Sequence, residues 1–299
     1  MRSSFIKWFD TYDDELGKGK DIDWFRIIPF ILLHLGCLLV LWVGVSPVAI
    51  LAAVCSYFLR MFCITGFYHR YFSHKSFSTS RTMQFIFAVF GAAATQRGPL
   101  WWAAHHRKHH RFVDTEKDPH RPDDGIFWSH MGWFLSKRNF STDLAGVKDW
   151  GRYPELVWLD RFDMVVPLAY ALGFYVVGFS LERYFPDLGT TGMQMLVWGY
   201  GVSTVVLLHA TLLVNSLAHK RGKRTFATDD KSRNNLFVAL VTLGEGWHNN
   251  HHRYAASVRQ GFYWWQIDIT YYLLKVFSMV GLVWNLKMVP KEVLKEGRH

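Results

Sequence analysis

Cysteine is scarce in this 299-residue sequence, which contains only Cys37, Cys55 and Cys63. No two of them are spaced as a CxxC pair, and each lies in an apolar run. Neither a disulfide framework nor a thiolate metal site is therefore expected. The three are also too few to hold an iron–sulfur cluster, so we interpret them as packing residues.

The sequence also lacks a basic low-complexity tail and any nucleic-acid-binding motif, although its formal net charge is +10. A charge of this sign favours binding to nucleic acid or to an anionic membrane surface. Half of the residues are hydrophobic and 17% are aromatic, with 14 Trp and 24 Phe. This composition favours the membrane, so we expect membrane lipid and no nucleic acid as a partner.

Four apolar segments are long enough to cross a bilayer, which requires about 20 residues. They form two hairpins, the first closed by Ser46-Pro47 and the second by residues 182–192. Two other apolar stretches, 83–95 and 262–286, are shorter or interrupted, and we expect helices in the interface or beneath the spans. The four predicted spans are 25–45, 47–66, 163–181 and 193–214.

Lysine and arginine are almost absent from the predicted hairpin tips. Only Arg183 lies there, and the other 33 of the 34 lie on the opposite side or at its membrane boundary. Cytoplasmic loops carry the excess of Lys and Arg, so both termini and the segments 67–162 and 215 onward are expected to be cytoplasmic. No repeat or linker divides the chain, and residues 1–299 are predicted to form a single all-helical membrane domain.

Histidine gathers in clusters that this topology places on one face of the membrane. Residues i, i+3 and i+4 share a face of a helix, so each HxxHH motif aims three rings one way. Asn215 and His219 are also four residues apart. The clusters are HRYFSH (His69, His74), HHRKHH (His105, His106, His109, His110), His219 and HNNHH (His248, His251, His252).

The spacing of the first cluster differs from that of the others. His69 and His74 are five residues apart, about 140° around a regular helix at ~100° per residue. They cannot share one face of an α-helix. Either the helix frays there, or the two histidines bind different metal ions.

Single histidines outside such motifs are usually surface residues or hydrogen-bonded core residues. His209 lies within a predicted span, where it could pack, form hydrogen bonds or serve a site. His105 and His120 could support metal ligands without binding metal. We interpret the remaining three as surface or core residues: His34, His130 and His299.

Nine histidines have ligand-like spacing, which is too many for one metal ion. Imidazole suits Zn, Cu, Fe and Ni, and a single zinc would take only three or four protein ligands. The number favours two ions with four or five ligands each. A soluble diiron bundle would show Glu and Glu-x-x-His on its helices, and this sequence does not. The interpretation that remains is a dinuclear iron site at a membrane surface whose protein ligands are all histidines.

Three segments, HRYFSHKSF, HRKHHRFVDTEKDPH and GEGWHNNHH, resemble the histidine boxes of integral-membrane fatty acid desaturases. The resemblance covers about residues 25–265 and is greatest to the stearoyl-CoA desaturase branch, in its bacterial form without a fused haem domain. Four residues between the histidines of the first box favour desaturases over the related hydroxylases. His248 at the head of the last box argues against the front-end desaturases, which commonly have Gln there.

The resemblance implies an oxygen-dependent oxidoreductase that introduces a cis double bond, Δ9 in this branch, into a saturated acyl chain. It implies two Fe²⁺ ions, dioxygen as co-substrate, and a multi-pass protein of the bacterial inner membrane with a cytoplasmic active site. Asn215 would hold a metal ion through water. The implied metal ligands are His69, His74, His106, His109, His110, His219, His248, His251 and His252.

The resemblance further implies that the acyl chain bends against Gln96, Trp102 and Thr211. The animal acyl-CoA enzymes have an Arg-Asp pair before the second box, where this sequence has Ala104 and His105. Acyl-CoA, acyl-lipid and carrier-linked substrates therefore all stay open. A basic pair that could contact the substrate head group is kept as Lys137-Arg138.

Electrons must reach such a site from a separate donor, for which ferredoxin, rubredoxin or a b-type cytochrome is expected. GEGWHN lacks the third glycine and the βαβ context of a dinucleotide-binding motif. The second ring nitrogens of metal-bound histidines need acceptors. Four carboxylates are near enough in sequence to supply them: Asp114, Glu116, Asp118 and Glu245.

Two other functions are compatible with parts of this pattern. A membrane hydroxylase of a lipid or alkane would use the same iron pair, and its product would gain oxygen instead of losing two hydrogens. A metal transporter would need polar residues along its spans, and the predicted spans offer few.

Overall fold

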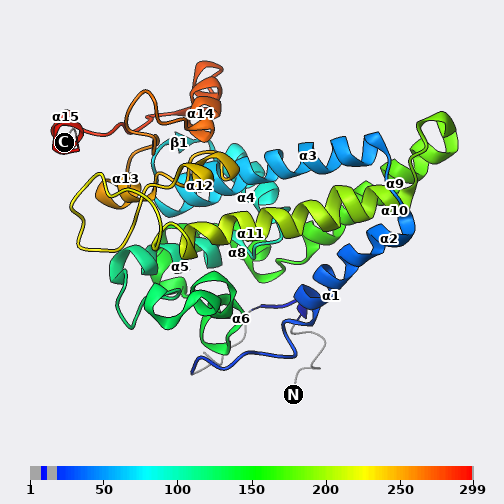
Figure 1. The fold of residues 1–299 in the computed structure, drawn as a ribbon, viewed down its shortest axis with the longest axis horizontal. Coiled ribbons are helices and arrows are strands. Elements are labelled where there is room, and N and C mark those ends of the chain that lie inside the picture. The colour runs from blue at the N-terminus through cyan, green and yellow to red at the C-terminus, as the bar shows by residue number, and fades with distance from the viewer. Residues whose placement is uncertain (1–7, 12–18, 298–299) are drawn as a thin grey trace.

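A computed structural model of the chain describes residues 8–11 and 19–297. The described chain is mostly helical (Figure 1), as predicted. Its two short strands, β1 (Ser78–Thr79) and β2 (Val283–Trp284), pair antiparallel, with Ser78 opposite Trp284.

Three helices are long and apolar enough to cross a membrane, and they match the second, third and fourth predicted spans. The first of them, Pro47–Ser73, extends seven residues beyond the predicted end at residue 66. Their parts are α3 (Pro47–Phe62) with η3 (Cys63–Ser73), then α9 (Val165–Tyr184), then α10 (Gly192–Gln194), η9 (Met195–Val202) and α11 (Ser203–Ser216).

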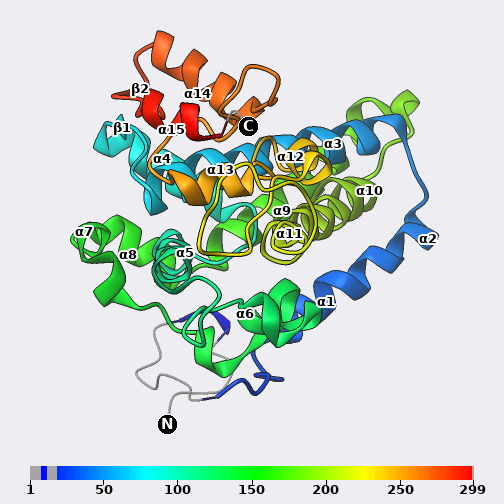
Figure 2. The same cartoon turned by 60° about the vertical axis from the view of Figure 1, so that its left-hand side comes forward.

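The first predicted span forms a shorter apolar helix, Ile28–Val43. It consists of α1 (Ile28–Gly36), a 3₁₀ turn η2 (Cys37–Leu39) and α2 (Val40–Val43), and none of its residues is buried. The prediction started at Phe25, but residues 24–27 form turns ahead of the helix. This helix lies along the edge of the bundle (Figure 2).

Local sequence explains where the long helices begin. The Ser46 hydroxyl accepts a hydrogen bond from the Ala49 amide, and Pro47 occupies the first turn of α3, where no amide hydrogen is needed. Thr191 and Gln194 form a reciprocal capping box at the start of α10. These caps satisfy amides that would otherwise lack acceptors at the helix starts.

Arg60 corrects one detail of the predicted topology. The predicted topology puts Arg60 with the basic residues on the cytoplasmic side or at its membrane boundary. The helix that begins at Pro47 continues to Ser73, however, so Arg60 lies at the middle of this candidate span. Its guanidinium is buried and donates to the hydroxyls of Ser203 and Thr204 and to the Ala93 carbonyl. These bonds fasten α3 to the third long helix.

The remaining elements surround one end of the long helices, opposite the connection from α9 to α10 (Figure 1). The apolar stretches 83–95 and 262–286 contain α4 (Arg81–Ala92) and α14 (Ile269–Met279), both shorter than a span. The other elements at this end are α5 (Pro99–Phe112), η4 (Pro122–Asp124), η5 (Trp128–Gly132), α6 (Trp133–Leu135), η6 (Lys137–Asn139), η7 (Leu144–Val147), α7 (Lys148–Gly151), α8 (Pro154–Arg161), α12 (Leu236–Val241), α13 (His248–Arg253) and α15 (Lys291–Glu296). The 3₁₀ turn η8 (Pro186–Leu188) lies in the connection from α9 to α10.

Candidate metal centre and adjoining cavity

The nine histidines with ligand-like spacing gather in two clusters at this end of the bundle. Within each cluster, one ring nitrogen of every member lies within 4.8 Å of those of all the others. Cluster one contains His69, His74, His106, His110 and His251. Cluster two contains His109, His219, His248 and His252.

The helix that carries the first motif, HRYFSH, does not fray, and its two histidines lie in the same cluster. Residues Cys63–Ser73 form a π-helix, and the His74 amide donates to the His69 carbonyl at 3.2 Å. In a π-helix, residue i bonds residue i+5, so residues five apart come onto one side. The rings of His69 and His74 lie 4.9 Å apart in cluster one, which excludes the expectation that they serve different ions.

Each HxxHH motif contributes to both clusters. In α5, His106 and His110 belong to cluster one and His109 to cluster two. In α13 the division is reversed, since His248 and His252 belong to cluster two and His251 to cluster one. The i, i+4 pair of each helix therefore serves one cluster, and the residue between them serves the other.

All nine rings present the same nitrogen, Nε2, to a neighbour in their cluster. The distances between paired Nε2 atoms run from 2.8 Å for His74–His106 to 3.4 Å for His109–His252. Two nitrogens bound to a common ion at about 2.1 Å lie roughly 3.0–3.4 Å apart, which fits these distances. The other pairs are His69–His251, His106–His110, His110–His251 and His219–His248.

Carboxylates orient several of these rings through Nδ1, the ring nitrogen that faces away from the cluster. Asp118 accepts from Nδ1 of His109 at 3.0 Å, and Glu245 contacts Nδ1 of His69. A neutral ring that donates through Nδ1 has its Nε2 lone pair free for a metal ion. Asp114 is 3.8 Å from His219, too far for a hydrogen bond. Glu116 contacts none of the nine among the residues that the structure describes.

The sequence reading missed Asp230, whose carboxylate accepts from Nδ1 of His252 at 2.8 Å. It also missed Gln260, which lies 3.2 Å from Nδ1 of His69. Asp230 lies in a polar loop 22 residues before His252. No spacing rule connects the two, so only the folded chain identifies this contact.

Burial favours the neutral, metal-binding form of several of these imidazoles. It lowers the pKa of His106, His110 and His251 well below the ordinary value, and the neighbouring rings lower it further. The pKa of His219 falls to about 3 for the same reasons. Asp230 is held as a carboxylate because His252 and Ser232 lower its pKa despite the opposing effect of burial.

The two box-bearing helices are fastened to each other beside cluster one. Arg107 of α5 donates to the carbonyls of Phe72 and Ser73 at the end of η3, at 2.7 and 3.0 Å. Asp149 holds the same guanidinium at 2.8 Å and also pairs with Lys75. The contacts satisfy terminal carbonyls of η3 and bring His74 against α5.

The remaining histidines lie outside the two clusters. His105 Nδ1 is 3.0 Å from the Trp101 carbonyl, and His120 packs on the ring of His109. His209 links Nε2 of His34, at 3.1 Å, to Nε2 of His130, at 3.0 Å, so His34 and His130 are hydrogen-bonded residues outside the clusters, as predicted. His299 lies outside the described residues.

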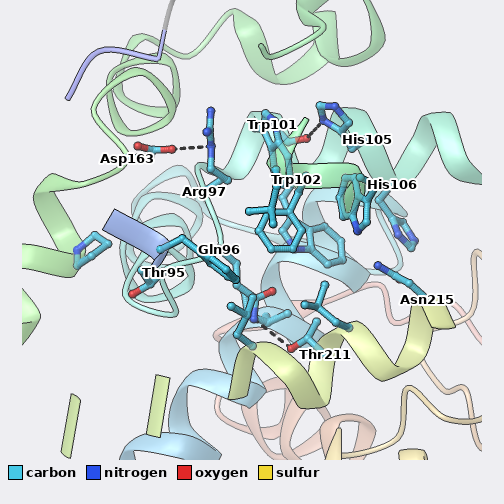
Figure 3. Close-up of a pocket in the computed structure, with 18 of the residues that line it drawn as sticks. Thr95, Gln96, Arg97, Trp101, Trp102, His105, His106, Asp163, Thr211 and Asn215 are labelled. Atoms are coloured by element: carbon cyan, nitrogen blue, oxygen red, sulfur yellow. Dashed lines mark hydrogen bonds and ion pairs between the residues drawn. The ribbon is translucent and has the colours of Figure 1, made fainter. Parts of the chain in front are cut away.

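A largely apolar cavity of about 500 Å³ adjoins both clusters and is lined by His69, His106, His109 and His248. Gln96, Trp102, Thr211 and Asn215 also line it. Figure 3 shows Asn215 and His106 on one side and the ion pair of Arg97 with Asp163 on the other.

The three residues predicted to bend a substrate contact the cavity together. Gln96 donates to the Thr211 hydroxyl at 3.0 Å, and the Trp102 ring stacks on His106 at 5.0 Å. Thr95 and Arg97 on either side of Gln96 have φ of 61° and 70°, which non-glycine residues seldom adopt. The tight turn places the buried Gln96 side chain against α11.

Lys137 and Arg138 lie apart from this group. Both belong to η6, Lys137 is exposed, and Arg138 donates to the Glu116 carbonyl at 3.3 Å. Neither lines the cavity. A role for this pair in binding a substrate head group stays a prediction.

Comparison with known proteins agrees with the site. A sequence model of the family described as fatty acid desaturase matches residues 26–285. A probable chloroplastic lipid desaturase of Arabidopsis thaliana is 40% identical over 244 residues, covering 81% of this chain but 64% of the relative. The chain thus spans less than two thirds of that protein.

Two other relatives are covered more fully. The delta-9 acyl-lipid desaturase 1 of Arabidopsis thaliana is 35% identical over 271 residues, which are 91% of this chain and 85% of the relative. The sn-2 palmitoyl-lipid 9-desaturase of Nostoc sp. (strain 36) is 32% identical over 295 residues, 97% of this chain and 99% of the relative. This chain belongs to the fatty acid desaturase family.

Proposed function

We propose that the chain is a membrane-bound acyl desaturase that introduces a cis double bond, at Δ9, into a saturated acyl chain. Dioxygen is the oxidant, so that R–CH₂–CH₂–R′, O₂, two electrons and two protons give R–CH=CH–R′ and two waters. The observation that carries the proposal is the convergence of nine Nε2 atoms in two clusters beside an apolar cavity. The named relatives support the position of the bond.

The two clusters suit two iron ions, with five histidines for one and four for the other, and Asn215 contributing through water. Iron bound there would supply the activation of dioxygen that removal of hydrogen from an unactivated methylene requires. The protein contributes neutral ligands, carboxylates that fix the rings, and a cavity that excludes water. Gln96, Trp102 and Thr211 would hold two adjacent methylenes beside the ions.

The same proposal covers the placement of the chain in the membrane. Residues 1–299 form one domain, Ile28–Val43 serves as a fourth crossing, and the metal-bearing end faces the cytoplasm of a bacterial inner membrane. Electrons come from a separate ferredoxin, rubredoxin or b-type cytochrome, and the net charge of +10 suits an acidic donor. The acyl chain is carried by CoA or by a lipid.

Product analysis tests the reaction. The chain is expressed with iron and a competent donor in a host that lacks desaturases, and fatty acids are profiled by mass spectrometry with double-bond location. We expect new Δ9-monounsaturated chains, two mass units lighter than their precursors. A gain of one oxygen would instead identify a hydroxylase, and unchanged lipids would refute the proposal.

A further inference from the structure

The cavity has an opening, and the exposure of its lining residues shows where that opening lies. Among the described residues that line it, only two are exposed, Leu32 at 60% and Leu168 at 49%. The others are buried or half-buried. The two most exposed lining residues are therefore apolar, one leucine from α1 and one from α9, and we take these two as the rim residues of the cavity.

Both rim residues belong to helices that face lipid. Leu168 is in α9, one of the three candidate spans, and Leu32 is in the apolar helix Ile28–Val43. Both α1 and α9 pack against η9 of the third long helix. Residues of α1, α9 and α11 all line the cavity, which places the opening on the hydrocarbon side of the bundle.

The depth of the opening follows from its position along the two helices. Leu32 is four residues into α1 and Leu168 three residues into α9, about 6 Å and 4.5 Å from the helix starts. Charged side chains that also line the cavity precede each helix, Arg26 before α1 and Asp163 before α9. The opening thus lies just below the charged level, at the depth of glycerolipid esters and their first methylenes.

Two cationic side chains lie at that charged level, each with an acidic partner: Arg26 with Asp23 and Arg97 with Asp163. The guanidiniums of Arg26 and Arg97 each lie 4.0 Å from the centre of the Phe140 ring, and both line the cavity. A lipid head group can therefore stay at the interface beside charge while an acyl chain extends inward. The second acyl chain of such a lipid would remain in the bilayer.

We propose that Leu32 and Leu168 frame a lateral portal through which an acyl chain of a bilayer glycerolipid enters the cavity and reaches the metal centre. The inference rests on the proposed desaturase function and specifies its substrate as lipid-linked. A chain carried by CoA would instead bring its head group from water, whereas the two exposed lining residues, Leu32 and Leu168, lie on apolar helices.

Narrowing the portal tests this route. The purified full-length protein, loaded with iron, is placed in vesicles of dipalmitoylphosphatidylglycerol with ferredoxin and its reductase, and unsaturated chains are measured. The portal variant is Leu32→Trp with Leu168→Trp. The matched control is Leu35→Trp with Leu172→Trp, because these leucines are exposed on the same helices but do not line the cavity.

We expect the portal variant to desaturate vesicle lipid about tenfold more slowly or worse, and the control to stay within about twofold of the wild type. Equal rates in the two variants would overturn the portal. So would a wild-type protein that desaturates palmitoyl-CoA in detergent micelles but leaves vesicle lipid unchanged. In both cases the desaturase function would stand.

A second measurement needs no turnover. Phosphatidylglycerol with a photoreactive diazirine midway along one acyl chain is crosslinked to the protein, and the labelled peptides are mapped. Labelling of the peptides that contain Trp102 and Thr211 is expected in the wild type and the control, and at least about tenfold less in the portal variant. Absence of cavity labelling in the wild type would overturn the portal even if the protein proved to have another activity.

Discussion

His251 is the member of its motif that faces cluster one, while His248 and His252 face cluster two. Its Nε2 lies 3.1 Å from that of His69 and 2.9 Å from that of His110, between two other helices. Removing it takes a ligand from the set of five. The long helices pack against one another elsewhere, through α3, α9, η9 and α11, so this ring is not part of their packing.

We therefore expect His251→Ala to abolish turnover and lower the iron bound per chain, while the protein still enters the membrane. Iron analysis and product profiling of the purified variant measure this. His130→Gln is the control, since His130 belongs to neither cluster. Wild-type activity in His251→Ala would mean that the ligand assignment is wrong.

The Asp230 carboxylate acts on the site through His252. Without it, the Nδ1–H of His252 loses its acceptor and the ring loses its fixed orientation. Partners of this kind typically change metal affinity by about 10–100-fold. Asp230→Asn should therefore release iron to a competing chelator at a correspondingly lower chelator concentration. The exposed neighbour Asp229, changed to Asn, should leave iron retention unaltered.

At the scale of elements, the fastening of η3 to α5 depends on the charge of Asp149. Contacts with Arg107 and Lys75 lower the pKa of this carboxyl to about 2, against the effect of partial burial. Its folded pKa lies below the unfolded value of about 3.9, so its stabilisation is complete above pH ~4 and lost as the pH falls towards 2.

Asp149→Asn should therefore unfold at a lower temperature than the wild type at pH 6, and the difference should shrink between pH 4 and pH 2.5. Because the side chain is partly exposed, we expect a contribution of only about 1 kcal/mol at neutral pH. Thermal unfolding in detergent at several pH values measures it. A difference in unfolding temperature that is constant with pH would exclude this ion pair as the cause.

The π-helix is the element that the five-residue spacing of the first motif required. Periodicity identified the conflict correctly, since two rings 140° apart on an α-helix cannot meet. Periodicity could not predict that the segment forms a π-helix, because this wider helix depends on the hydrogen bonds made at its end. Here Arg107 and Trp150 supply donors to the Phe72 carbonyl.

For the whole molecule, the proposed orientation puts the α9–α10 connection outside the cell and the metal-bearing end inside. Single cysteines can be introduced after Cys37, Cys55 and Cys63 are replaced by alanine. Asp187→Cys, in η8, should react with a membrane-impermeant maleimide added to intact cells, whereas Asp229→Cys should react only after lysis. The reverse pattern would invert the topology, and labelling of both in intact cells would contradict the four crossings.

Residue spacing alone determined the helical class, the apolar segments and the set of nine histidines. These features depend on a helical period or on contacts between near neighbours in the chain, which a sequence states directly. Even so, the first predicted span starts at Phe25, three residues before the helix begins at Ile28. Apolar residues also occur in the turns that precede the helix, so hydropathy does not mark its first residue.

Only the tertiary structure decided how the histidines divide into two clusters, and which carboxylates support them. It also decided that Arg60 lies within the bundle and that residues of α1, α9 and α11 line one cavity. Each of these depends on side chains brought together from distant segments, as with Asp230 and His252. Packing geometry sets such contacts, and no period in the sequence encodes it.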